Sequence, residues 1–433
     1  MKYSRYNVIA KADEGCYILY NLLSEALIEM DSENRDYYLH CLERGKEGDE
    51  RLTILKDNGF LIDDDYDEID FLRYANKKYC TMNDVLQLTI APTMDCNCKC
   101  TYCFEKPHPG KMTDDTMEAV YRFIISQHQT MRYRFLHVDW FGGEPMLCWD
   151  VIRTLSERLI RFAAENDITY SAGMITNGTI VNPDLVREMG EARIKDIQIT
   201  LDGPREIHDK RRMFRSDKGT FDLILNNLKY FIDSGINITV RVNIDRRNVG
   251  ALEEVREAVK AVNPQCRAYP AMVENFTEMG ENDLQSIMGS SEFSLEVKSK
   301  YLLRDIAAGE LPTRFISCQA QKLNAFGIDE RGYLYKCWNE LGIPELSFGT
   351  VFDYPKRING KNLAKFAGRD YIGHPECQEC KVLPICMGGC AKMRQKNGEL
   401  PCIAEKYCIE EYVLNIWRKK IQERKETPHE ADQ

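Results

Sequence analysis

The sequence predicts an α/β fold whose larger part is a parallel sheet, flanked by a smaller domain on each side. Three observations predict it. Short apolar stretches alternate with amphipathic helical stretches between about residues 84 and 305, a compact α+β pattern precedes them, and cysteines become dense after them. Such alternation is typical of parallel strands joined by helices. We therefore expect domains at residues 1–80, 81–305 and 306–433 of this 433-residue chain.

Residues 1–80 are expected to form a small α+β domain. The segment Tyr6–Met30 has two apolar stretches around a turn at Ala12–Gly15, as a β-hairpin has. Helical stretches are expected after it near Tyr37–Arg44 and Glu50–Asn58, and Gly59–Ile62 is expected to form a turn.

The central region supplies six candidate strands with helical stretches between them. The strands are Val85–Ala91, His137–Phe141, Gly173–Thr176, Asp196–Leu201, Asn237–Ile244 and Cys266–Pro270. Helices are expected at Asp114–Gln127, Val151–Asn166 and Phe221–Gly235. Six such units predict a partial (β/α)6 barrel rather than a complete eight-stranded one, with reactive groups at the C-terminal strand ends.

Composition narrows the function classes. A net charge of -10 argues against broad binding to nucleic acid, which needs a basic face. No apolar run approaches the roughly 18 residues of a membrane span, and the first residues lack the apolar core of a secretory signal. We therefore expect a cytoplasmic protein without a membrane partner.

The chain has 17 cysteines, and ten of them fall into two closely spaced patterns. The first pattern, Cys96, Cys100 and Cys103, places three thiolates on one short loop after the first strand. Three thiolates can hold three irons of a [4Fe–4S] cluster and leave the fourth iron open, whereas a ferredoxin supplies four. Cys98 lies inside the first gap and could compete as a ligand, but its position points its side chain away if the outer three converge.

This loop, with Tyr102 before its last cysteine, resembles that of the radical S-adenosylmethionine (SAM) superfamily. The stretch Gly142, Gly143, Glu144 and Pro145 ends the second strand, where that family has its GGEP motif. The resemblance implies that SAM chelates the open iron. It also implies that the motif's carbonyls and the Glu144 carboxylate receive the methionine ammonium. The alternative interpretation of this stretch is an ordinary strand-to-helix turn.

The resemblance also assigns the rest of the SAM pocket. Arg212, in a His-Asp-Lys-Arg-Arg run before Gly219-Thr220-Phe221, would pair with the cofactor carboxylate, because a guanidinium is planar and always charged. The alternative is a solvated basic turn. The Tyr102 backbone would contact adenine. The residues implied to line ribose and methionine are Thr176, Asn177, Thr200 and Asp202.

The second pattern resembles the SPASM domain, which holds two auxiliary [4Fe–4S] clusters. The first would be held by Cys318, Cys337 and Cys390, and the second by Cys377, Cys380, Cys386 and Cys402. Cys408 is an alternative to Cys402. Some SPASM enzymes have a further cysteine where this chain has Asn324, so the first cluster could have an open iron. Four of these cysteines could instead form a zinc ribbon. Outside the two patterns we expect structural thiols, one of which could fill that vacancy.

Residues 1–80 resemble the winged-helix RiPP recognition element, which grips the leader of a precursor peptide by adding it to a strand edge. The alternative is a cap on the catalytic domain. The whole layout is similar to that of the thioether-forming sactipeptide and ranthipeptide maturases, with a deoxyadenosyl radical abstracting hydrogen from the peptide. It implies three [4Fe–4S] clusters, SAM, a precursor peptide and a reductant such as flavodoxin or ferredoxin.

Other activities remain open at this point. Carbon–carbon crosslinking and epimerising peptide maturases can have the same arrangement of cysteines. An anaerobic sulfatase-maturating enzyme, which makes formylglycine, is a further alternative, although such enzymes usually start near the radical loop. A non-catalytic iron–sulfur protein would leave the GGEP motif without a purpose.

Overall fold

The computed structural model describes residues 1–433 except 46–47, 275–280, 305–309, 317, 398–399 and 427–433. The chain divides into two compact units. The first unit, built from three separate segments, comprises 1–79, 289–317 and 370–433; the second comprises 80–288 and 318–369. Within the described residues, no helix combines the length and the apolar character needed to cross a bilayer.

The second unit is organised around a nine-stranded sheet in the order β11-β10-β9-β8-β7-β6-β12-β13-β14. Strands β6 to β12 pair in parallel, and β13 and β14 extend that edge as antiparallel strands. The strands are β6 Val85–Ile90, β7 Phe135–Trp140, β8 Thr169–Thr176, β9 Ile194–Thr200, β10 Asn237–Ile244, β11 Arg267–Met272, β12 Ala325–Ile328, β13 Tyr333–Tyr335 and β14 Gly349–Thr350.

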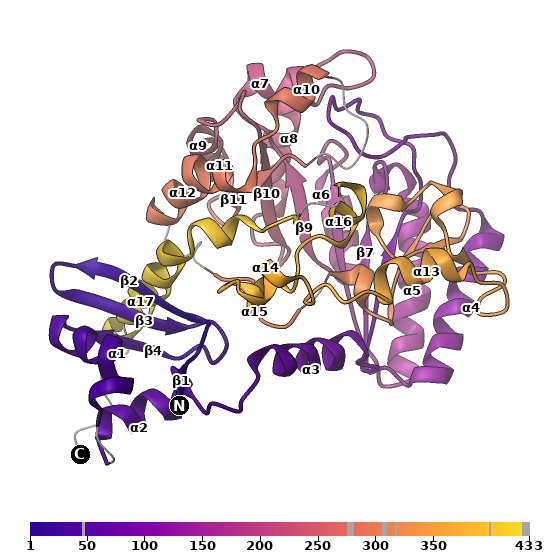
Figure 1. The fold of residues 1–433 in the computed structure, drawn as a ribbon. Helices are drawn as coiled ribbons and strands as arrows, with labels where there is room; N and C mark the ends of the chain where they lie inside the picture. The colour runs from indigo at the N-terminus through magenta and orange to yellow at the C-terminus, as the bar shows by residue number, and fades with distance from the viewer. Residues whose placement is uncertain (46–47, 275–280, 305–309, 317, 398–399, 427–433) are drawn as a thin grey trace, which may run out of the picture. The chain divides into compact units, whose positions relative to one another are not determined.

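Helices connect successive parallel strands, as Figure 1 shows. In one of them, α5 (Trp149–Glu165), the buried residues Val151, Leu155, Leu159 and Phe162 recur every three or four positions and form one apolar stripe. The remaining helices of this unit are α4 Asp114–Met131, α6 Pro183–Glu191, α7 Arg205–Arg211, α8 Phe221–Asn227, α9 Leu252–Val262, α10 Glu281–Ser286 and α13 Gly360–Ala367.

The mixed α/β fold with a parallel core is thus confirmed, and the six predicted strands correspond to β6 through β11. The structure adds a seventh parallel strand, β12, beside β6. The four residues of β12 are all buried. No helical pattern of the central kind leads into so short a strand, which is why the alternation appeared to stop before it.

The first unit begins with the predicted hairpin. Strands β2 (Asn7–Asp13) and β3 (Cys16–Asn21) pair antiparallel around Gly15, whose φ of +76° suits the turn. Strand β4 (Leu27–Met30) completes the three-stranded sheet beside β3. The helices α1 and α2 follow as Ser32–Arg44 and Glu50–Asp57, and the pair of short strands β1 and β5 as Lys2–Tyr3 and Leu61–Ile62.

The core of this unit joins both ends of the chain. Tyr6, Val8 and Ile18 belong to one buried cluster with Val382 and Val413. The last helix, α17 (Ile409–Glu426), packs on β2 and β3 (Figure 1). The other helices of the unit are α3 Glu68–Cys80, α11 Ser290–Phe293, α12 Ser299–Arg304, α14 Pro375–Gln378, α15 Leu383–Cys386 and α16 Ala391–Asn397.

Candidate active site

A cavity of about 280 Å³ lies at the C-terminal ends of the parallel strands. The cysteine loop after β6 forms one wall, and the ends of β7 through β11 form others. The sequence-predicted residues that line it are Cys96, Cys100, Cys103, Tyr102, Gly142, Gly143, Thr176, Asn177, Thr200 and Arg212. The structure therefore brings the cysteine loop and most of the implied SAM pocket to one place.

Two glycines allow β7 to end directly against the base of the cysteine loop. A Cβ on Gly142, whose φ is +106°, would lie 2.3 Å from the Thr93 carbonyl oxygen. A Cβ on Gly143 would lie 2.2 Å from the carbonyl oxygen of Asp95. No other residue type fits without moving the backbone, so these glycines form a close-packed backbone cradle beside the cysteines.

Glu144 lies behind this cradle rather than in the cavity. Its carboxylate is fully buried and accepts hydrogen bonds from Thr176 Oγ1 at 2.6 Å, Asn177 N at 2.7 Å and Met146 N at 3.0 Å. These contacts hold the ends of β7 and β8 together. Burial raises the pKa of Glu144, and the hydrogen bonds act against that rise. Neither Glu144 nor Pro145 lines the cavity, so the motif contributes to the cavity wall through its glycines.

Cys98 does not point away from the other cysteines, and that expectation was wrong. Its side chain lines the same cavity and exchanges a hydrogen bond with the Cys96 thiol. Asn177 Nδ2 lies 3.5 Å from Cys98 Sγ and donates to Asn97 Oδ1 at 2.7 Å. The loop is therefore tied to the end of β8 through Asn177, which the sequence placed in the pocket.

Arg212 lines the cavity, whereas its neighbour Arg211 does not. Arg212 Nη1 donates to the Tyr102 hydroxyl at 2.7 Å, and Asn243 Nδ2 donates to the same oxygen at 3.1 Å. Arg211 is buried and forms ion pairs with Asp202 at 3.5 Å and Asp245 at 3.2 Å. Asp202, which the sequence placed at the cofactor, is thus a fully buried partner of Arg211 and also bonds the Tyr102 hydroxyl.

The residues around Arg212 explain the spacing of its motif. Asp209 accepts hydrogen bonds from the backbone of Thr220 and Phe221, and a Cβ on Gly219 would lie 2.1 Å from its carboxylate. His208 Nε2 shares a hydrogen bond with Thr220 Oγ1 at 2.9 Å, and Thr220 Oγ1 donates to the Arg212 carbonyl. These hydrogen bonds hold the run that contains His208 and Arg212 against Gly219-Thr220-Phe221. They fix the backbone from which Arg212 extends.

The chemistry of the loop suits an iron–sulfur cluster. Burial raises the pKa of the Cys100 thiol, which Arg212 opposes, and raises that of Cys103 to about 12. Such thiols become thiolates when a metal displaces their protons. In the described part of the chain, no three His, Cys, Asp or Glu side chains converge on a single-ion site. Three thiols that line one cavity match the three protein ligands of a [4Fe–4S] cluster with an open iron.

Sequence reasoning missed the aromatic and charged residues that also line the cavity. Phe104, Phe141 and Trp338 form a stack with ring-centroid distances of 6.4 and 6.0 Å. Arg241 and Glu274 add charge to the lining, and burial raises the pKa of Glu274. Alternation along β10, which turns Arg241 and Asn243 to the same face, was the available signal.

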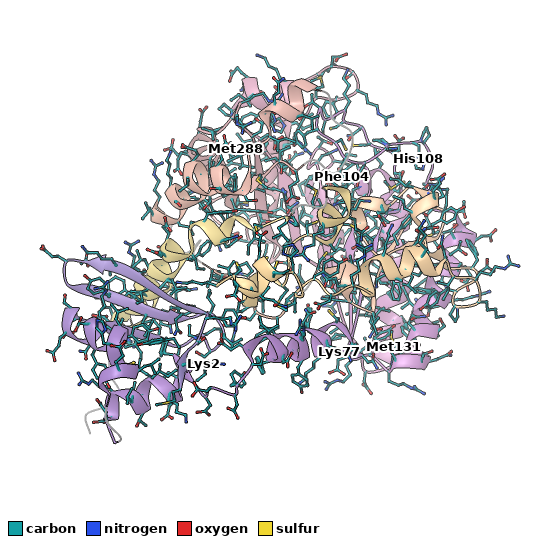
Figure 2. All side chains as sticks on the ribbon, viewed as in Figure 1. Lys2, Lys77, Phe104, His108, Met131 and Met288 are labelled. Carbon is teal, nitrogen blue, oxygen red and sulfur yellow. The ribbon has the colours of Figure 1, made fainter. Side chains whose placement is uncertain are left out.

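The segment after the cysteines is anchored outside the cavity. His108 Nε2 lies 2.9 Å from Glu330 Oε1, in the turn between β12 and β13. Figure 2 labels Phe104 and His108 at the two ends of this segment. The anchor keeps the chain beyond Cys103 close to the added edge of the sheet.

The four preferred ligands of the second auxiliary cluster lie together in the first unit. Cys377, Cys380, Cys386 and Cys402 line one recess, with Lys406 beside them. Arg394 Nη2 lies 3.0 Å from Cys377 Sγ, and Lys406 Nζ lies 3.6 Å from Cys402 Sγ. Cys408 does not line this recess. It is buried against Leu302 and Tyr412, which favours Cys402 as the ligand.

The three cysteines implied for the first auxiliary cluster are divided between the units. Cys318 and Cys337 belong to the second unit, and Cys390 belongs to the first. The neighbours of Cys318 and Cys337 are therefore residues of the second unit, and those of Cys390 are residues of the first.

Comparison with known proteins agrees with these features. A cysteine-type anaerobic sulfatase-maturating enzyme of Clostridium novyi is 23% identical over 350 residues, covering 72% of this chain and 89% of the relative. The radical SAM cyclopropyl synthase TigE of Paramaledivibacter caminithermalis is 19% identical and covers 98% of this chain and 94% of the relative. The structure of Streptococcus suis SuiB bound to precursor peptide SuiA aligns with a TM-score of 0.52 at 16% identity, covering 94% of this chain and 99% of SuiB.

The model of the radical SAM superfamily matches residues 90–259, which span the cysteine loop, the glycine cradle and Arg212. SuiB was also solved bound to S-adenosylmethionine. Residues 90–259 are therefore a radical SAM domain, and this domain makes the chain an iron–sulfur enzyme that uses a [4Fe–4S] cluster and S-adenosylmethionine.

Proposed function

We propose that this enzyme modifies a ribosomally made precursor peptide, forming thioether crosslinks from its cysteines. The observation that carries the proposal is the three-stranded sheet of the first unit, with β4 at its edge, in the same chain as the SAM cavity. A relative and a solved structure that cover this region as well as the radical SAM domain support it.

The edge of β4 is the proposed docking site for the leader. In the described residues β4 pairs with β3 alone, while α17 packs on β2 at the other edge. An unpaired edge presents N–H and C=O groups to which an extended peptide adds as a further strand. Leu39 and Leu42 on the neighbouring helix α1 are 42% and 39% exposed and offer apolar contacts to leader side chains.

The SAM cavity would receive the reacting part of the peptide. The cluster bound at Cys96, Cys100 and Cys103 and the SAM held beside it would supply a deoxyadenosyl radical that removes a hydrogen atom from the substrate. Arg212 would pair with the cofactor carboxylate, and the glycine cradle would offer its peptide groups. The aromatic stack of Phe104, Phe141 and Trp338 would exclude water, and Arg241 and Glu274 would orient the peptide.

Thioether formation needs an outlet for one electron. When a substrate thiol bonds to a carbon radical, it loses a proton, and one electron must leave the product. The two auxiliary clusters proposed at the SPASM cysteines would accept that electron, and a flavodoxin or ferredoxin would reduce the SAM cluster.

Coexpression with a precursor peptide tests the function. Each thioether lowers the peptide mass by one H2, and tandem mass spectrometry locates it at a cysteine. Alkylating the substrate cysteines beforehand should abolish the change. A mass loss that persists after alkylation would point to carbon–carbon crosslinking, and deuterium uptake without mass loss to epimerisation.

Leader docking is tested without turnover. Glu29→Pro, in β4, should weaken leader binding, because the register of β4 on β3 turns the Glu29 N–H to the free edge and proline cannot donate to an added strand. The control is Leu223→Ala on α8, which changes an exposed residue of the other unit. Equal leader affinity in both variants, measured by fluorescence anisotropy, would argue against the β4 edge.

Sulfatase maturation is the second candidate, favoured by the C. novyi relative. It predicts formylglycine in a short sulfatase peptide that contains the target cysteine. Incubating the reconstituted enzyme with such a peptide, without any leader, separates the two candidates.

A further inference from the structure

Cys80 ends helix α3, immediately before the first strand of the large sheet, and belongs to the second unit with Cys318 and Cys337. No role has been assigned to it so far. Its carbonyl oxygen accepts a hydrogen bond from Leu323 N at 2.9 Å. Leu323 lies on the loop that starts at Cys318, so the backbone of Cys80 is bonded to the loop that carries an implied cluster ligand.

Asn324 connects the same two segments. Its side-chain amide donates to the Met82 carbonyl at 2.7 Å and to Asn83 Oδ1 at 3.0 Å. This residue occupies the position where some SPASM enzymes have an additional cysteine. The side chain that replaces the cysteine therefore binds the chain directly after Cys80.

Lys336, directly before Cys337, binds the same loop. It is 2% exposed, and its Nζ donates to the Lys322 and Ala325 carbonyls. Both acceptors lie on the chain that follows Cys318, so these bonds connect the neighbour of Cys337 to the loop that meets Cys80.

Unsatisfied donors flank Cys318. Gln321 is 8% exposed, and its Nε2 has no hydrogen-bond partner among the described residues. The same is true of Gln319 Nε2. Both residues belong to the 3-10 turn that Cys318 caps. Buried donors without acceptors are costly and indicate a missing acceptor group, for which cluster sulfur is suited.

We propose that Cys80 is a ligand of the first auxiliary iron–sulfur cluster, together with Cys318 and Cys337, in place of the cysteine that position 324 lacks. The inference rests on the auxiliary clusters of the proposed function. This cluster then has Cys80 at the coordination position that Asn324 leaves open. It takes up an electron and does not bind the substrate thiol.

The test uses the full chain with Cys96, Cys100 and Cys103 replaced by alanine, so that only auxiliary clusters give signals. This protein should hold about eight irons, as two [4Fe–4S] clusters do. Its EPR spectrum after reduction should not change when free cysteine is added. Adding Cys80→Ala should alter the signal of one cluster and make that signal respond to free cysteine. Cys266→Ala, which removes a buried thiol in the second unit, is the control and should change neither property.

Unchanged auxiliary signals in Cys80→Ala, or a response to free cysteine while Cys80 is intact, would overturn the proposal. About four irons in the starting protein would instead overturn the two auxiliary clusters themselves, and with them this ligand. Cys80→Ser controls for misfolding, because a folded protein with an altered signal from one cluster supports ligation. The circular dichroism spectrum and the unaltered signal of the other cluster report that fold.

Discussion

Arg211 and Arg212 are consecutive, yet one is structural and the other faces the cavity. Arg211 is buried between Asp202 and Asp245, while Arg212 reaches the Tyr102 hydroxyl at the cavity wall. The hydrogen bond between His208 and Thr220 fixes the turn that carries both arginines. At the scale of single residues, the two arginines therefore differ in role because their partners differ: Arg211 pairs with buried carboxylates, and Arg212 reaches the cavity wall.

Substituting the two arginines should separate binding from stability. Arg212→Gln should weaken SAM binding roughly 10- to 100-fold, because hydrogen bonds to charged groups contribute about 1.5–3 kcal/mol. Arg211→Gln should instead lower the free energy of unfolding by about 3–5 kcal/mol, since it removes the ion pair of the buried Asp202 and leaves the buried Asp245 paired with Arg247 alone. Isothermal titration calorimetry and urea unfolding measure the two effects. A loss of SAM affinity confined to Arg211→Gln would reverse the assignment.

Arg394 should tune the second auxiliary cluster. Its guanidinium donates to the Tyr371 carbonyl at 2.9 Å and lies 3.0 Å from Cys377 Sγ. Hydrogen bonds to cluster sulfur and positive charge stabilise the reduced form. Arg394→Gln should lower the reduction potential by on the order of 60 mV, which corresponds to about 1.4 kcal/mol for one electron. An EPR-monitored redox titration tests this, with the exposed Lys381→Gln as a control that should not move the potential.

At the scale of elements, the site depends on how strand ends and turns hold one another. Asp209 and Gly219 join α7 to the start of α8, and Glu144 joins β7 to β8. His208 belongs to the first of these locks: it is fully buried and bonds the Asp202 backbone and Thr220. Because His208 is buried and neutral, the hydrogen bonds that it makes are sensitive to acid.

Burial, with help from Arg212, lowers the pKa of His208 to about 3, from an ordinary value of 6.5. Between these values the unfolded chain binds a proton that the folded protein does not. His208 therefore contributes fully to stability above pH 6.5, and this contribution is lost as the pH falls towards 3, at about 1.4 kcal/mol per pH unit. His208→Gln should show a shallower pH dependence of unfolding below pH 6.5. Equal slopes would contradict a neutral His208.

The sequence could predict those parts of the site that rest on local spacing. Cys96, Cys100 and Cys103 share one loop, and the two glycines need only their own backbone geometry to be recognised. The contacts of Glu144 with Thr176 and Asn177 could not be predicted, because these partners come from the next strand. The aromatic stack was missed because Trp338 is far along the chain, and β12 because four buried residues carry no period.

At the scale of the whole molecule, residues 1–79 share one core with the C-terminal segment. Arg5 Nη1 donates to the Gln378 carbonyl at 2.8 Å, next to the cysteines of the second auxiliary site. The region proposed to bind the leader and the region proposed to hold this cluster therefore depend on one another for folding.

Deleting residues 1–79 should remove more than leader binding. It removes the apolar partners of Val382 and Val413, so the cysteines at 377–402 should lose their cluster. The radical SAM domain should still bind its own cluster, giving a fall of about four irons per chain. Iron analysis and limited proteolysis check this. Unchanged iron content would mean that the two segments fold separately.

Because the first unit is built from three separate segments, the ribosome makes its parts at different times. The hairpin of β2 and β3 leaves the ribosome early, but its core partner Val413 is made more than three hundred residues later. At roughly 5–20 residues per second, the apolar face of the hairpin waits on the order of tens of seconds for the helix that covers it. Newly made chains must therefore pass through a period in which this face is available to chaperones and to other nascent chains.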